Sequence, residues 1–174
     1  MDFAVILGGV NMKKITLFCF TLLLLTASSA LSQQVNYTID YSADFSKFKT
    51  YKWLAIQNVG AIDNLTNEQI KAVIDTALAQ KGLTKVDVDT ADLLIDYQSR
   101  ELITDKVPMD PSGSPPVTIY QGDLAIDMYT PAKHQLVWRG VASKALDPKA
   151  NAEKRQKNLD KAVAKLMKNY PPPK

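Results

Sequence analysis

The sequence has few of the residues that most often carry catalysis or bind metals. It contains one cysteine, Cys19, and one histidine, His134, among 174 residues. Because Cys19 lies in an N-terminal segment that we expect to be removed, the remaining chain can form no disulfide, thiolate nucleophile or cysteine metal site. His134 falls in an expected turn, and the sequence places no nucleophile beside it, so it does not indicate nucleophilic catalysis.

A strong charge of either sign is also missing. Lysine and arginine number 21 against 18 acidic residues, which gives a formal net charge of +3. This excess is too small to indicate a nucleic-acid partner. The longest apolar run falls short of the roughly 20 residues that a membrane-spanning helix requires, so we expect no stable membrane insertion of the mature chain.

The N-terminal segment has the pattern of an export signal. Lys13 and Lys14 form a basic start, residues 15–25 form a short apolar stretch, and a small-x-small cleavage site ends at Ser32. The pattern predicts a signal peptide over residues 1–32. The mature protein would then be periplasmic or secreted.

Two residues in this segment bear on its interpretation. Met12 directly precedes the lysine pair and is the alternative translation start. Cys19 follows Phe18 inside the apolar stretch, whereas a lipid-acceptor cysteine would follow a small residue at its end. We therefore expect no lipid anchor.

Residues 33–174 are expected to form a single α+β domain. The chain is 46% hydrophobic and 22% charged, which is typical of globular proteins. The predicted centre of the fold is a hairpin over residues 117–143, where apolar residues recur with the two-residue period of half-buried strands. One face of the hairpin would carry Leu124, Ile126, Met128, Leu136, Trp138, Gly140 and Ala142.

The remaining elements follow from similar patterns. Strands are expected at residues 35–41, 50–54 and 92–103, with a short edge strand at 83–88 and loops at 58–65 and 107–116. A helix should begin at Thr66, which has Gln69 three residues later as in a capping box, and end at Lys81-Gly82. A second helix should follow Asn151. The order β-β-α-(β)-β-β-β-α predicts an antiparallel sheet of about five to six strands with two amphipathic helices on one face.

Several short motifs in this order resemble a known family. They are Asp44-Phe45, Thr50-Tyr51-Lys52-Trp53, Ala91-Asp92-Leu93-Leu94-Ile95-Asp96-Tyr97, residues 120–127, Leu136-Val137-Trp138-Arg139-Gly140, and a basic helix that runs into Tyr170-Pro171-Pro172. The arrangement resembles the bacterial envelope family known as domain of unknown function 4136. The resemblance implies a small exported domain, commonly a lipoprotein, with no established activity and no catalytic residues. This chain departs from that pattern because it lacks the lipid-acceptor cysteine.

The sheet face opposite the helices is the predicted interaction surface. Its side chains are both apolar and charged, and they are Leu94, Asp96, Asp123, Asp127, Val137, Arg139 and Val141. Such a face is either solvated or covered by a partner or a second copy of the chain. We expect Asp127 to lie across from or diagonal to Arg139 in a surface ion pair that contributes roughly 0.2–1 kcal/mol.

The carboxylates on this face suggest one further alternative. Together with Asp92, they would suit calcium, which prefers oxygen ligands. Strand-borne side chains rarely converge as the ligands of calcium loops do, so we predict a solvated face and no metal site.

These features favour a non-enzymatic binding or structural accessory protein of the cell envelope. Its partner would be an unknown envelope protein or another copy of the chain. The alternative is a small-ligand or glycan-binding protein that uses strand aromatics and the loop at 107–116, and a further alternative is a hydrolase. No catalytic, cofactor-binding or metal-binding residue is predicted.

Overall fold

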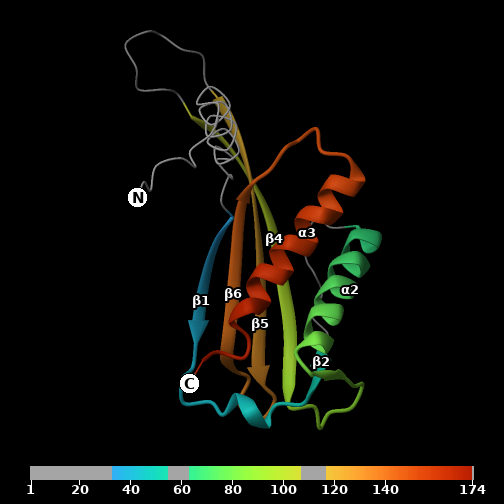
Figure 1. Ribbon diagram of the computed structural model, residues 1–174, viewed down its shortest axis with the longest axis vertical. Helices are drawn as coiled ribbons and strands as arrows, with labels where there is room; N and C mark the ends of the chain where they lie inside the picture. Colours follow the sequence, from blue (N-terminus) through green and yellow to red (C-terminus); the bar gives the residue numbers. More distant parts are fainter. Residues whose placement is uncertain (1–32, 55–62, 107–116, 174) are drawn as a thin grey trace, which may run out of the picture. The chain divides into compact units, whose positions relative to one another are not determined.

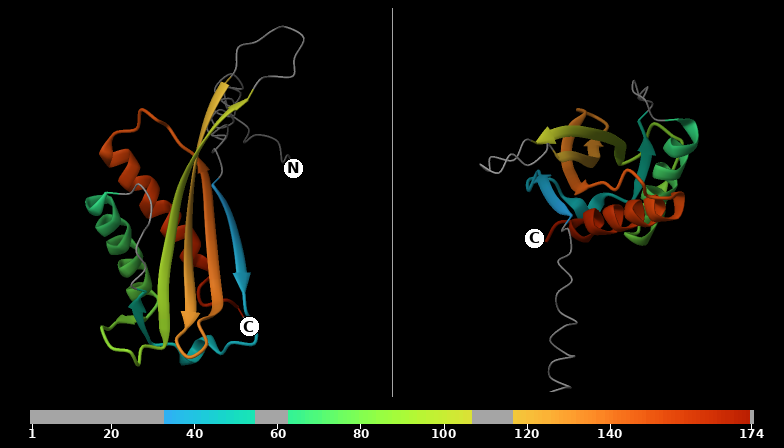
Figure 2. Two further views of the ribbon diagram at one scale, coloured as in Figure 1. Left: turned by 180° about the vertical axis from the view of Figure 1, so that it is seen from behind. Right: turned by 90° about the horizontal axis from the view of Figure 1, so that it is seen from above.

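The computed structural model describes residues 33–54, 63–106 and 117–173. These residues belong to one compact unit. They form an α+β fold in which a six-stranded sheet carries two helices on one face (Figures 1 and 2). The predicted fold class is confirmed. The predicted signal peptide, the loop at 107–116 and most of the loop at 58–65 lie outside the described residues.

The elements have the following bounds. The strands are β1 (Gln34–Ile39), β2 (Thr50–Trp53), β3 (Thr84–Lys85), β4 (Leu93–Lys106), β5 (Val117–Thr130) and β6 (Gln135–Ala145). The helices are α2 (Asn64–Gln80) and α3 (Ala152–Leu166), and the short 3-10 helices are η1 (Phe45–Lys47) and η2 (Met167–Asn169). Among the described residues, no helix has the length and apolar character needed to cross a bilayer.

The sheet has the strand order β1-β6-β5-β4-β2-β3. The predicted β5–β6 hairpin is present, with β4 and β1 paired antiparallel on either side. Of its two strands only β5 is central, because β6 lies next to the edge strand β1, so the hairpin is displaced from the predicted centre. β2 is parallel to both β4 and β3, so the sheet is mixed and only mostly antiparallel. The reason is that α2 follows β2 and returns the chain to the end where that strand began, as parallel neighbours require.

The core lies between the sheet and the two helices. Leu93, Ile95, Ile126, Met128 and Trp138 of the sheet are fully buried. They pack against apolar stripes of the helices, which comprise Ile70, Ile74, Leu78, Ala162, Val163 and Leu166. The two-residue period of the strands and the helical period of the stripes therefore identify this core from the sequence.

The helix ends agree with the predictions except at the start of α2. Its N-cap is Asp63, whose carboxylate accepts hydrogen bonds from the backbone N–H and the hydroxyl of Thr66, at 2.9 and 2.7 Å. Thr66 is thus the residue that is capped, because an N-cap side chain bonds the N–H three residues on. Gly82 follows α2 with a φ of +82°, and Asn151 caps α3 by accepting from the Lys154 N–H at 2.9 Å.

Polar tips of strand aromatics attach the helices to the sheet. Tyr97 Oη lies 2.6 Å from Asn67 Oδ1 of α2. On the other side, the Tyr37 hydroxyl donates to the Lys165 carbonyl of α3 at 3.0 Å, and Trp138 Nε1 donates to the carbonyl that ends η2 at 3.2 Å. Each ring therefore contributes both buried apolar area and a specific attachment.

Candidate functional site

The sheet face opposite α2 and α3, named the outer face below, is the candidate site. Neither helix covers it (Figure 2). Strand pairing places Asp127 between Asp96 of β4 and Arg139 of β6. Adjacent rows of this face contain Leu94, Gln98, Arg100, Asp123, Ala125, Tyr129, Val141 and Ser143. Of the seven residues predicted from the sequence, six thus lie on the outer face, and Val137 does not.

Asp127 and Arg139 form a bidentate ion pair at the centre of this face. Arg139 Nε lies 2.5 Å from Asp127 Oδ1, and Arg139 Nη2 lies 2.5 Å from Oδ2. The Tyr129 hydroxyl donates to the same carboxylate at 3.2 Å. The Asp127 side chain is 0% exposed, whereas that of Arg139 is 36% exposed. The expectation of a surface ion pair was therefore wrong, because the carboxylate is fully buried beneath its partners.

The electrostatics of the pair extend to its neighbours. The hydrogen bonds that Arg139 donates to Asp127 raise the pKa of Arg139 above the usual range. Burial, followed by the charge of Asp127, raises the pKa of Tyr129. Burial also raises the pKa of Asp96, with a further contribution from the Asp127 charge, while the Tyr97 N–H and Arg139 oppose this rise. Arg139 thus binds the Asp127 carboxylate directly, whereas Asp96 interacts with the pair only through its charge.

Val137 is buried in the core cluster, with 2% exposure, beside Trp138. The register shifts at this point, because Met128 pairs with Trp138 but Tyr129 pairs with Leu136. The extra residue is a β-bulge, and a bulge interrupts the alternation of side chains between the two faces. The strict two-residue period therefore assigned both Val137 and Leu136 to the wrong faces.

The four carboxylates considered for calcium do not converge. Asp92 accepts from the backbone N–H groups of Lys49 and Thr50, at 2.9 and 2.8 Å, and these bonds lower its pKa. Asp123 instead pairs with Arg100 at 3.2 Å. Within the described ranges, no group of three or more His, Cys, Asp or Glu side chains is placed to hold a metal ion.

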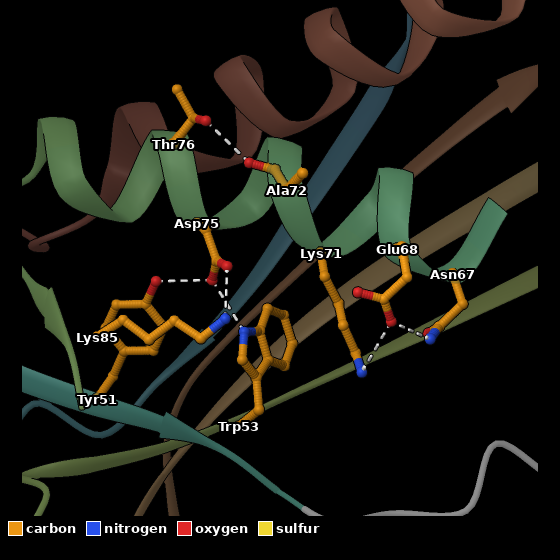
Figure 3. A network of polar contacts seen from close by, with 9 residues as sticks. All are labelled: Tyr51, Trp53, Asn67, Glu68, Lys71, Ala72, Asp75, Thr76 and Lys85. Carbon is orange, nitrogen blue, oxygen red and sulfur yellow. Dashed lines mark hydrogen bonds and ion pairs between the residues drawn. The ribbon is translucent and has the colours of Figure 1, made fainter. Parts of the chain in front are cut away.

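A second polar cluster, which the sequence did not indicate, joins α2 to β2 (Figure 3). Asp75 Oδ1 accepts from the Tyr51 hydroxyl at 2.6 Å and from Trp53 Nε1 at 2.8 Å, while Oδ2 accepts from Lys85 Nζ at 2.9 Å. Burial, with Asp75 as a smaller cause, raises the pKa of Tyr51. The side chains bond one another across the helix–sheet junction, so their arrangement serves attachment.

A groove of about 580 Å³ lies on the helix side of the sheet. Its apolar lining includes Ile70, Leu124, Ala142, Leu146, Leu159 and Ala162, and its polar lining includes Glu101, Lys144, Arg155 and Asn158. Tyr120 also lines it, whereas other aromatics considered for ligand stacking, Tyr51, Tyr97 and Trp138, are buried in the core. The sequence does not reveal the groove, because its walls come from three strands, β4, β5 and β6, and two helices that only the tertiary fold brings together.

His134, the sole histidine, is exposed in the β5–β6 turn with a φ of +47°. It is separated from the row of Asp96, Asp127 and Arg139, because further pairs of the hairpin, including Met128 with Trp138, lie between that row and the turn. The turn position expected from the sequence is confirmed.

Comparisons with known proteins identify a family and a shared fold. The family described as Domain of unknown function (DUF4136) matches residues 35–172. No curated protein matches the chain. Among solved structures, a PelC dodecamer from Paraburkholderia phytofirmans has a TM-score of 0.55 and 9% identity, and the match covers 82% of this chain and 100% of that chain.

A PDZ domain protein from Parabacteroides distasonis is similar at a TM-score of 0.54 and 18% identity, over 82% of this chain. The chain spans 37% of the length of that protein. At such identities, both likenesses show the fold alone.

Proposed function

This chain belongs to the family described as Domain of unknown function (DUF4136), and we propose that it is an exported, non-enzymatic accessory protein of the cell envelope that associates with further copies of itself through the outer face. The signal-peptide pattern of residues 1–32 supports export. The observation that carries the association is the Asp127–Arg139 pair, which holds a buried carboxylate on a face that neither helix covers.

Covering a charged face normally carries a large desolvation penalty. Here the Asp127 carboxylate is already fully buried, and Arg139 neutralises its charge. A partner that covers this row therefore removes little additional water from the carboxylate. The half-buried side chains of Leu94, Ala125 and Val141 supply apolar area around the pair, and arginine is enriched at the centre of interfaces.

A second copy of the chain is the partner that we propose. The support comes from the PelC structures, which share this fold over 100% of their chains and are described as dodecamers. A non-enzymatic role fits the same geometry, because the Asp127 carboxylate is engaged by Arg139 and by the Tyr129 hydroxyl.

The test measures the mass of the protein in solution, after expression of the full chain, by sedimentation velocity over a range of concentrations. Ala125→Lys places a long, charged side chain on the outer face, and Ala72→Lys makes the same change at an exposed position of α2. We expect assemblies larger than a monomer for the wild type and for Ala72→Lys, and monomers for Ala125→Lys, because burying the added charge in an interface is costly.

Circular dichroism would establish that both variants remain folded. A wild-type protein that stays monomeric at the highest concentration, or an Ala125→Lys variant that assembles like the wild type, would contradict the proposal.

A further inference from the structure

The groove on the helix side of the sheet has the features of a ligand site. We propose that it binds an amphiphile with a single acyl chain and an anionic head group. The groove lies mainly on the helix side of the sheet and shares the ion-paired residues Arg100 and Asp123 with the outer face. This inference rests on the groove lining and does not depend on the proposed association. Figure 1 shows that α2 and α3 both have their first turns on the side towards the end of β4 and the start of β5, whose tips extend beyond both helices. The groove is lined by residues of these parts.

The size and floor of the groove suit an acyl chain. Its volume of about 580 Å³ lies within the range of small-molecule sites. Leu124, Ala142 and Ala162 contribute to the lining and are 7%, 2% and 8% exposed, so the floor is continuous with the hydrophobic core. An acyl chain in this groove would remove apolar surface of both molecules from water.

Gly122 helps to keep the groove open. A Cβ atom at this position would lie 3.0 Å from both Cδ atoms of Leu146. Leu146 therefore packs directly over the glycine, and a branched side chain at position 122 would displace it. Since Leu146 lines the groove, this displacement would fill part of it.

Two cations at one side of the groove supply the head-group contact. Lys144 Nζ donates to Asn158 Oδ1 at 2.7 Å, and Arg155 Nε donates to the Ala150 carbonyl at 3.0 Å. Both partners are neutral, so neither charge is cancelled by its hydrogen bond. Because Asn158 and Arg155 are three residues apart on α3, the two cations lie near the same helix face.

The other charged residues of the lining do not neutralise Lys144 and Arg155. Arg100 pairs with Asp123 at 3.2 Å, and Asp147 pairs with Lys154 at 2.7 Å. Glu101, on β4, is the remaining carboxylate of the lining, whereas Lys144 and Arg155 are two cations that form no ion pair with any described residue. The balance favours an anionic head group beside Lys144 and Arg155.

A glycan fits this lining less well than an acyl chain. Sugars are held by stacked aromatic rings and by many hydrogen-bonding groups. The described lining offers one aromatic ring, Tyr120, above a floor of aliphatic side chains. The aliphatic floor and the two neighbouring cations, Lys144 and Arg155, thus both favour an anionic amphiphile.

The experiment uses laurate as the anionic probe and monolaurin as a neutral probe with the same chain. Both are titrated below their micellar concentrations, by calorimetry, into the purified protein expressed from the full chain. The variants are Lys144→Gln and Arg155→Gln, with Lys161→Gln on the exposed surface of α3 as the matched control. Gly122→Val tests the chain-binding part of the groove.

We expect each of Lys144→Gln and Arg155→Gln to weaken laurate binding about tenfold, because a charge-assisted contact is lost. The control should leave laurate binding unchanged. Monolaurin should bind more weakly than laurate and respond to neither substitution, and Gly122→Val should weaken both probes while the protein still melts cooperatively.

Three results would overturn the inference: no binding of laurate, equal binding of both probes with no effect of the cation variants, or unchanged binding of both probes to folded Gly122→Val. Ligand binding and oligomeric mass are separate readouts, so failure here is distinguishable from failure of the outer-face association.

Discussion

Replacing Arg139 by alanine removes the partner of the buried Asp127 carboxylate. Asp127 loses the two contacts of 2.5 Å to the guanidinium and keeps only the Tyr129 hydroxyl at 3.2 Å. Removing one member of a fully buried pair typically costs about 3–5 kcal/mol. Because the Arg139 side chain is 36% exposed, the pair is partly screened by solvent. We therefore expect Arg139→Ala to lower the free energy of unfolding by about 2–4 kcal/mol.

The reciprocal substitution should cost less. In Asp127→Asn, the guanidinium that remains is partly exposed and can be hydrated, so we expect a loss of about 1–2 kcal/mol. Replacing both residues by leucine leaves no unpaired charge and should cost less than Arg139→Ala alone. The order of the three losses therefore reports which member of the pair is buried.

Urea unfolding followed by the fluorescence of the two tryptophans measures these free energies. Trp138→Ala provides the benchmark for a core truncation, and it should cost about 3–5 kcal/mol because this ring is fully buried. If Arg139→Ala costs less than about 1 kcal/mol, or no more than Asp127→Asn, the carboxylate is hydrated and the reasoning is refuted.

Three further substitutions test the core, the groove and the outer face separately. Gly140→Ala should destabilise the protein by about 1–3 kcal/mol, because the new Cβ would lie 2.6 Å from the Trp138 ring. Gly122→Ala should cost less, because its new Cβ meets only the flexible end of Leu146, at 3.0 Å. Equal losses of the two variants in urea unfolding would contradict this. Burial raises the pKa of Asp96 above its reference value of 3.8, so its charged form destabilises the folded state at neutral pH, and this penalty is lost as the pH falls through the folded pKa towards 3.8. Asp96→Asn should thus raise Tm at about pH 7 but not at about pH 3, and an equal gain at both pH values would speak against a raised pKa.

The sequence predicted the layers of the fold because strand and helix periods depend on neighbours in the chain. Ile126, Met128 and Trp138 were assigned to the core on this basis, and all three are fully buried. The two-residue period of the strands assigned residues to the wrong face where a local irregularity interrupts the strand. Leu136, Val137 and Trp138 are three consecutive apolar residues, so the pattern there does not decide which of them face the core. The bulge is defined only by the pairing of β5 with β6.

Properties that depend on burial between distant elements were less predictable. The sequence placed Asp127 near Arg139, and the register confirms that the two residues are directly opposed. It gave no sign that the carboxylate would be fully buried, because this depends on how Arg139 and Tyr129 fold over it. Similarly, the parallel pairing of β2 follows from the path of α2 across the sheet, which the amphipathic pattern of the helix does not specify.

The most direct test of the proposed association is the thiol accessibility of the outer face in the cell envelope. Val141→Cys introduces a half-buried thiol on this face, and Ala72→Cys introduces an exposed thiol on α2. The only native cysteine, Cys19, lies in the predicted signal peptide. We predict that a thiol reagent modifies Val141→Cys much more slowly in the envelope than in dilute purified protein, whereas Ala72→Cys reacts equally in both. Equal reactivity of Val141→Cys in the envelope and in dilute solution would contradict the account.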